Sequence, residues 1–269
     1  MGFRRPCRSI KPRLEVLGER ALPSVNVPFV ECHGTVTISG NKNANTIIVS
    51  DDGTNNPGSI FVQIDNQTFQ STGVVKHIVI DSGNGADSIV YELNGELDSL
   101  RTVDADLGGQ NDSFIASLHA PIGATGKLRI GADGGNGDDN LSLETAGVDV
   151  YGGGVLVVGF AGGNGNDTLN MGYSGFLSGT ARFFASGGNG KDTVVGNIAL
   201  SSYEESETGG TVFSNGNLTA CFSGGNGKDD VALSVLNADG LSSLNADVFG
   251  GHGKDTITAT SNVDVHDRR

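Results

Sequence analysis

The sequence predicts an all-β solenoid of about seven to eight stacked coils. Three observations support this fold class. A glycine-rich turn ending in aspartate recurs along the chain, its copies start 25 to 37 residues apart, and apolar and polar residues alternate on both sides of it. A fixed turn at such a period is typical of a repeat fold in which each copy adds one coil. Strict alternation indicates β-strands with one buried face.

The N-terminal part divides into two segments. Residues 1–30 are basic, with six basic and two acidic side chains in positions 1–20, and they contain four prolines. We expect them to form a targeting or processing segment outside the fold. The stretch LEVLGERALPS at 14–24 resembles a short signature at the front of exported repeat proteins of some bacteria. Residues 31–80 are expected to form a capping β region, with Asn45 at the aspartate position of a worn first repeat.

Residues 81–261 contain the repeats. The motif Gly-Gly-x-Gly-x-Asp begins at residues 134, 162, 187, 224 and 250, and weaker copies occupy 82–87 and 107–112. The residues two, four and six places before each full turn are all apolar, as is the residue two places after its aspartate. Each unit therefore predicts a strand, a glycine turn, a second strand and a return loop. An exposed excursion is expected at about 203–210, and residues 262–269 form a tail.

The composition of the turn suggests a purpose for its aspartate. Glycine at the first, second and fourth positions permits backbone angles closed to other residues and removes side chains from a tight bend. Equivalent aspartates of stacked coils would lie roughly 4.8 Å apart. Two bare carboxylates at that distance repel by roughly 3.5 kcal/mol at an effective dielectric constant of about 20. A divalent cation between coils reverses this term, and calcium tolerates such irregular oxygen cages better than magnesium does.

The nine residues GGNGNDTLN at 162–170 resemble the RTX, or haemolysin-type, calcium-binding nonapeptide. The resemblance implies a right-handed parallel β-roll or β-helix with calcium between stacked turns. It implies these metal ligands: Asp87, Asp139, Asp167, Asp192, Asp229 and Asp255. Asp112 stands in a damaged copy and is left outside this set. Because one nonapeptide occurs per roughly 26 residues, we expect a wider, three-faced coil with metal along one side only.

Two interpretations without metal stay open: a metal-free solenoid, and antiparallel hairpins built on the Asn-Gly pairs. Three lysines stand at the fifth turn position, Lys191, Lys228 and Lys254. A nearby ammonium group should weaken metal binding, although these side chains are expected to point to solvent.

Composition narrows the function. The formal net charge of −14 disfavours nucleic-acid binding, and no apolar run is long enough for a membrane span. With 6% aromatics and no tryptophan, the chain is not expected to carry a sugar-stacking platform. We expect a non-catalytic, secreted bacterial protein, extracellular or on the cell surface. Its partners would be calcium ions and, beyond them, cell-surface polysaccharide or other surface proteins.

The alternative function is a β-helix carbohydrate-active enzyme, a lyase or hydrolase with structural calcium. Such an enzyme would need clustered carboxylates, or a basic residue, in a cleft on one face. Four basic residues are expected near outer faces: Arg101, Lys127, Arg129 and Arg182.

Overall fold

The computed structural model describes residues 29–54, 59–204 and 211–261. The described residues form strands and loops with no helix, and so include no helix long and apolar enough to cross a membrane. The expected targeting segment, except for its last two residues, and the C-terminal tail lie outside the described residues.

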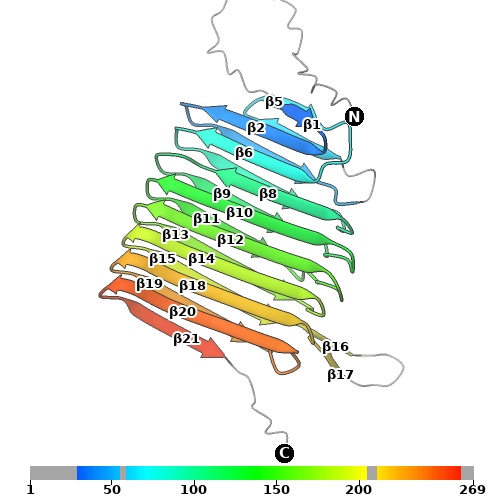
Figure 1. The fold of residues 1–269 in the computed structure, drawn as a ribbon, viewed down its shortest axis with the longest axis vertical. Helices are drawn as coiled ribbons and strands as arrows, with labels where there is room; N and C mark the ends of the chain where they lie inside the picture. Colours follow the sequence, from blue (N-terminus) through cyan, green and yellow to red (C-terminus); the bar gives the residue numbers. More distant parts are fainter. Residues whose placement is uncertain (1–28, 55–58, 205–210, 262–269) are drawn as a thin grey trace, which may run out of the picture.

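Two long sheets contain nearly all of the strands (Figure 1). The nine-stranded sheet has the order β1 (Val30–Cys32), β2 (Thr35–Asn41), β6 (His77–Gly83), β8 (Leu100–Asp106), β10 (Lys127–Asn136), β12 (Val155–Asn164), β14 (Thr180–Gly190), β18 (Asn217–Gly227) and β20 (Ser243–Gly253). The ten-stranded sheet has the order β21 (Thr256–Ser261), β19 (Asp230–Leu236), β15 (Thr193–Leu200), β13 (Thr168–Gly175), β11 (Asn140–Thr145), β9 (Ser113–Leu118), β7 (Ser88–Leu93), β3 (Thr46–Asp51), β4 (Ile60–Ile64) and β5 (Gln67–Gln70).

The chain is a parallel β-solenoid of about seven turns. Each glycine turn carries the chain from one sheet to the other, so the two strands that flank it, such as β10 and β11, never pair with each other. They pair in parallel with the equivalent strands of the neighbouring coils, as β10 does with β8 and β12. The solenoid prediction is confirmed, and the alternative of antiparallel Asn-Gly hairpins is wrong.

The expected third face is reduced to a narrow edge. Successive return loops meet there only through single parallel bridges, such as those that join Ile122 to Val150 and Val150 to Leu177. Between β13 and β14 the return loop has only four residues, 176–179, which is too short for a further strand. The coil therefore has two broad sheets, with the glycine turns on one edge and the return loops on the other.

The core fills the space between the sheets, where apolar residues of both inner faces interlock. The predicted inward residues of the first four full repeats are all buried, from Leu128 in β10 to Phe222 in β18. In the last repeat, Leu244 and Val248 are half-buried, Ala246 is exposed and Ile257 is 52% exposed, because no described coil packs against them. The alternating pattern thus predicts the inner face correctly, and position in the stack decides how much of it is covered.

Antiparallel strands lie at the N-terminal end of the two sheets. Strand β1 pairs antiparallel with β2, and β4 and β5 add antiparallel strands beside β3. Beneath them Arg101 makes a buried ion pair with Asp51, 2.6 Å from Nε to Oδ2. Arg101 is therefore a core residue, and the expectation that it lies near an outer face is wrong.

The described residues at either end of the expected excursion form two short antiparallel strands. Strands β16 (Ser202–Glu204) and β17 (Thr211–Phe213) pair with each other outside both sheets. Figure 1 shows this hairpin projecting from the return-loop edge. Residues 205–210, which fall within the expected excursion, lie outside the described residues.

Candidate metal centre

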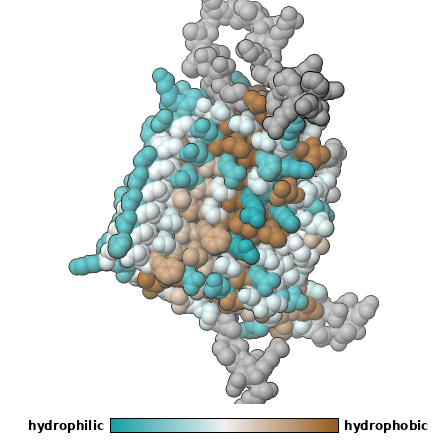
Figure 2. All heavy atoms as spheres, viewed as in Figure 1, coloured by the Kyte–Doolittle hydropathy of each residue, from teal (hydrophilic) through white to brown (hydrophobic). Residues whose placement is uncertain are grey.

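The glycine turns have the backbone that their sequence predicts. In the turn at 162–167, the glycines at the second and fourth positions, Gly163 and Gly165, have φ of 104° and 148°. Residues with a side chain rarely adopt these angles. The turns stack along one edge of the molecule. Figure 2 shows a column of hydrophilic residues along this edge, where the nine-stranded sheet meets the turns.

The third turn position adds an exposed ladder of asparagine amides. The Asn164 Nδ2 group donates to Asn136 Oδ1 at 3.0 Å, and Asn189 donates to Asn164 at 2.8 Å. Asn226 donates to Asn189 in the same way, also at 2.8 Å. These side-chain hydrogen bonds link the turns of adjacent coils in register.

The aspartates at the sixth position form one continuous column inside the turn edge. Each uses Oδ1 to accept a hydrogen bond from the backbone N–H of the equivalent residue in the preceding coil. The distances run from 2.7 Å for Asn45 to Asp87, through 2.8 Å for Asp139 to Asp167, to 3.1 Å for Asp229 to Asp255. Asn45 starts the column, as expected from its place in the worn repeat. The carboxylates are thus built into the fold and do not fan out into water.

The other carboxylate oxygen, Oδ2, has no hydrogen-bond partner in six members of the column. These buried oxygens belong to Asp87, Asp112, Asp139, Asp167, Asp192 and Asp229. All six side chains are at most 3% exposed. A buried carboxylate oxygen without a partner is costly unless a cation or a proton compensates it. A bound cation or a proton would therefore stabilise the unpartnered Oδ2 atoms of these six aspartates.

In the full repeats, the first position of the turn accepts only glycine, because a side chain there would collide with Oδ2. A Cβ atom added to Gly134 would lie 2.5 Å from Asp139 Oδ2 and 2.5 Å from the carbonyl oxygen of Gly162 in the next coil. The strand pairing between β10 and β12 skips Gly134 and Gly162. Because Gly134 does not have a left-handed φ, glycine is needed here for room rather than for backbone freedom. One carboxylate oxygen and one carbonyl oxygen thus face a common small space.

The same arrangement recurs in the next three coils but not in the two before them. Added Cβ atoms at Gly162, Gly187 and Gly224 would likewise collide with Oδ2 of their own aspartate and with the first-glycine carbonyl of the next coil. In the weaker copies this position holds Ser82 and Leu107, both fully buried. Ser82 donates its hydroxyl to Leu107 O at 2.8 Å. Four aspartates therefore stand beside a first-position glycine whose added Cβ would collide with Oδ2 and with the next coil: Asp139, Asp167, Asp192 and Asp229.

Burial raises the pKa of five carboxyls of the column. Desolvation is the largest cause, the backbone N–H donated to Oδ1 opposes it, and neighbouring carboxylates add to it. The pKa of Asp112 rises to about 7 and that of Asp167 to about 6. Asp87, Asp139 and Asp192 shift in the same direction. Without a cation, part of the column would hold protons near neutral pH.

The residues present suit a hard cation held largely by backbone oxygens. Within the described ranges, no three His, Cys, Asp or Glu side chains come together as a metal-binding group. A metal would therefore take one carboxylate per turn together with main-chain carbonyls, which suits calcium and excludes thiolate or imidazole chemistry. The fifth-position lysines, Lys191, Lys228 and Lys254, are exposed as expected.

The structure brings the six predicted ligands into one column but distinguishes among them. Four stand beside a first-position glycine that also meets the next coil; Asp87 shares its turn with Ser82, and Asp255 lies in the last described coil and is only half-buried. Asp112, left out of the predicted set, belongs to the column as fully as the others, with Oδ1 2.7 Å from the Asp87 nitrogen. Its spacing in the damaged copy was the signal for including it.

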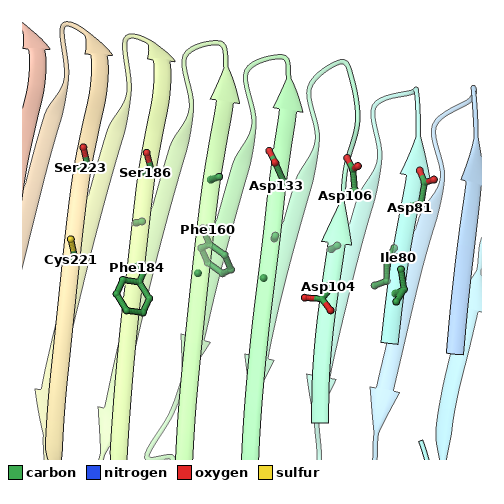
Figure 3. Close-up of a pocket in the computed structure, with 17 residues that line it drawn as sticks. Ile80, Asp81, Asp104, Asp106, Asp133, Phe160, Phe184, Ser186, Cys221 and Ser223 are labelled. Carbon is green, nitrogen blue, oxygen red and sulfur yellow. The ribbon is translucent and has the colours of Figure 1, made fainter. Parts of the chain in front are cut away.

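A second feature lies on the outer face of the nine-stranded sheet. A shallow hollow of about 830 Å³ is lined there by Asp81, Asp106 and Asp133 in one row, and by Asp104 and Phe184 in the next (Figure 3). Its floor lacks side chains at Gly131 and Gly159. By strand register Arg129 and Arg182 occupy a neighbouring row of the same face.

No family model, curated protein or solved structure matches this chain at a significant level. The resemblance to RTX repeats thus stays a prediction from the sequence.

Proposed function

We propose that this β-solenoid is a non-catalytic, secreted protein whose central coils are tied together by calcium ions. The observation that carries the proposal is the row of six buried Oδ2 atoms without partners, four of which share a small gap with a first-position glycine and the carbonyl oxygen of the next coil. A cation there would neutralise the carboxylates and connect each coil to the next. Structural calcium of this kind suits an extracellular or cell-surface location, because external modules work at about 10⁻⁴–10⁻³ M calcium.

The ligands would come from two adjacent turns. In the space beside Asp167, the carboxylate Oδ2 is on one side and the carbonyl oxygen of Gly187 is on the other. Since this geometry occurs beside four aspartates, we expect about four ions per chain. At free calcium about 100 times Kd, each independent site would add about 2.7 kcal/mol to the free energy of unfolding.

The test compares two isosteric variants of the full chain. Calcium stoichiometry is measured by titration calorimetry after chelator treatment, and thermal unfolding is followed with calcium, with magnesium and with chelator. Asp167→Asn should lose one ion and part of the calcium-dependent rise in Tm. Asp112→Asn should keep the full stoichiometry because Leu107 fills its turn.

Two results would contradict the proposal. One is a calcium-dependent rise in Tm no larger than the rise with magnesium. The other is an unchanged stoichiometry in Asp167→Asn. Either would favour the metal-free solenoid, with protons on the column instead of ions.

The hollow on the nine-stranded sheet supports a second candidate, a carbohydrate-active enzyme with structural calcium. Its rows of Asp81, Asp104, Asp106 and Asp133 provide the clustered carboxylates that such an enzyme needs. Incubation with acidic and neutral polysaccharides, followed by a reducing-end assay, tests it. Activity that disappears in Asp104→Asn and Asp106→Asn would replace the non-catalytic proposal.

A further inference from the structure

A different hollow lies on the return-loop edge, beside the β16–β17 hairpin. It has a volume of about 540 Å³, within the range of small-molecule sites. Its lining residues are Asp149, Tyr151, Phe176, Ser178, Tyr203, Val212 and Asn215. The hairpin is the insertion that interrupts the regular repeat, and insertions in solenoids often build the binding face.

Aromatic rings concentrate at this hollow. Phe176 and Tyr203 meet edge to face, with ring centroids 5.0 Å apart and an interplanar angle of 64°. Tyr151 and Tyr203 are 40% and 52% exposed. The chain has four tyrosines and no tryptophan, so half of its tyrosines stand here. The low aromatic content of the whole sequence conceals this local cluster.

The loops that carry these rings are held by the coil ladder. The Tyr151 N–H donates to the carbonyl of Ile122 at 3.0 Å, and the Asn215 N–H donates to that of Leu177 at 2.9 Å. Asp149 Oδ1 accepts the Phe176 N–H at 2.8 Å, so this carboxylate also joins two coils. A site on anchored backbone loses little entropy when a ligand binds.

We propose that this hollow binds one or two units of a saccharide. A pyranose ring presents apolar C–H faces that pack on exposed aromatic rings, and hydroxyl groups that need hydrogen-bonding partners at its rim. The hollow offers both: tyrosine faces, and beside them the Ser178 hydroxyl, the Asn215 amide and the Asp149 carboxylate. An organic cation would also suit the rings, but hydroxyls and an amide outnumber the single lining carboxylate and favour a neutral polyhydroxylated ligand.

Tyrosine fluorescence gives a direct test. Tyr91 and Tyr173 are buried in the core, so Tyr151 and Tyr203 are the tyrosines open to a ligand. The full chain is first probed on a printed array of defined mono- to tetrasaccharides, and the best binder is then titrated in solution. We expect saturable fluorescence changes, and at least tenfold weaker binding in Tyr203→Ala and Asn215→Ala. Binding should persist in chelator, which separates this proposal from the calcium proposal.

Phe213→Ala is the matched control, because Phe213 is 51% exposed on the same hairpin but does not line the hollow. It should bind as the parent does, and circular dichroism confirms that each variant is folded. Three results would overturn the proposal: no saccharide bound on the array, equal binding by the parent and Asn215→Ala, or tetramethylammonium displacing the saccharide at lower concentration than glucose does.

Discussion

The turns of the weaker repeats and those of the central coils share one hydrogen-bond column but differ beside it. Oδ1 of Asp112 and Oδ1 of Asp139 each accept the N–H of the preceding coil at 2.7 Å. Beside Asp112 the first turn position holds buried Leu107, whereas beside Asp139 it holds Gly134, where a Cβ would collide with Oδ2 and the Gly162 carbonyl oxygen. Oδ1 thus accepts a hydrogen bond in both kinds of coil. Oδ2 stands beside a first-position glycine only in the central coils.

The two regions also differ in the interactions that could stabilise them without a metal ion. The N-terminal coils have the antiparallel cap and a buried ion pair, in which Asp51 accepts from Arg101, Tyr91 and the Gly53 N–H. The central coils have no such pair among the described residues, since Asp51 with Arg101 is the sole salt bridge found there. We infer that the N-terminal end is stable without metal and that the central coils depend on it.

Removing the anchor of the N-terminal end should have the largest effect. Asp51→Ala leaves the Arg101 guanidinium buried without its counter-charge, which costs about 3–5 kcal/mol. Denaturant unfolding in saturating calcium measures this cost, and calcium should not restore it. Asp52→Ala, a half-buried neighbour, is the control and should change the unfolding free energy by less than about 1 kcal/mol. A full rescue by calcium would contradict the division into two regions.

Filling one central space should have the next largest effect. In Gly162→Ala the new Cβ meets Asp167 Oδ2 and the Gly187 carbonyl oxygen, so we expect the loss of one bound calcium and about 1–3 kcal/mol of overpacking. The control is Gly159→Ala in the same strand, where an added Cβ meets nothing within 4 Å. That variant should be neutral or more stable by up to about 1 kcal/mol. Equal calorimetric stoichiometry in both variants would show that the space holds no ion.

The pH dependence of stability should also differ between the weaker repeats and the central coils. Because burial raises the pKa of Asp112 to about 7 and that of Asp167 to about 6, the folded state binds these protons more tightly than the unfolded state does. This stabilisation is complete below pH 3.8 and is lost as pH rises toward 7. In chelator, Tm should therefore fall between about pH 4 and 7.

Calcium should remove only part of that slope. It would compensate Asp167, but Asp112, flanked by the charges of Asp87 and Asp139, lies beside a filled position. We expect Asp112→Asn to flatten the slope that persists in calcium, as measured by Tm against pH. An Asp112→Asn variant with the slope of the parent would show that other groups cause it.

The fold could be predicted from the sequence because alignment of the repeats shows which residues are equivalent in successive coils. The inward residues from Leu128 to Phe222, the turn aspartates and the hairpin insertion all follow from alignment of the copies. The place of Asp112 in the column could not be predicted from its damaged motif; it follows from the pairing of Ser113 with Asn140 and the hydrogen bond from the Asp112 N–H to Asp139 Oδ1. The pairing of Arg101 with Asp51 could not be predicted either, because it depends on a contact across 50 residues.

The sequence predicts the column of aspartates, but it does not predict which of them stand beside a glycine that also meets the next coil. The motif names the aspartate, while the role of the first glycine appears only when the next coil is placed against it. Ser82 and Leu107 look like mild departures from glycine in the sequence. In the stack they occupy the place where an ion would need room.

The smallest effect we predict concerns the amide ladder of the central turns. Asn189 donates to Asn164 and accepts from Asn226, both at 2.8 Å, whereas in the weaker repeats the ladder is broken at Gly109. Asn189→Ala removes two exposed hydrogen bonds, so we expect a loss of about 0.5–1 kcal/mol in chelator. In calcium the loss should shrink, because bound ions would fix the same turns. Denaturant midpoints in both conditions measure the difference, and a larger loss in calcium would show that ladder and ions do not act on the same register.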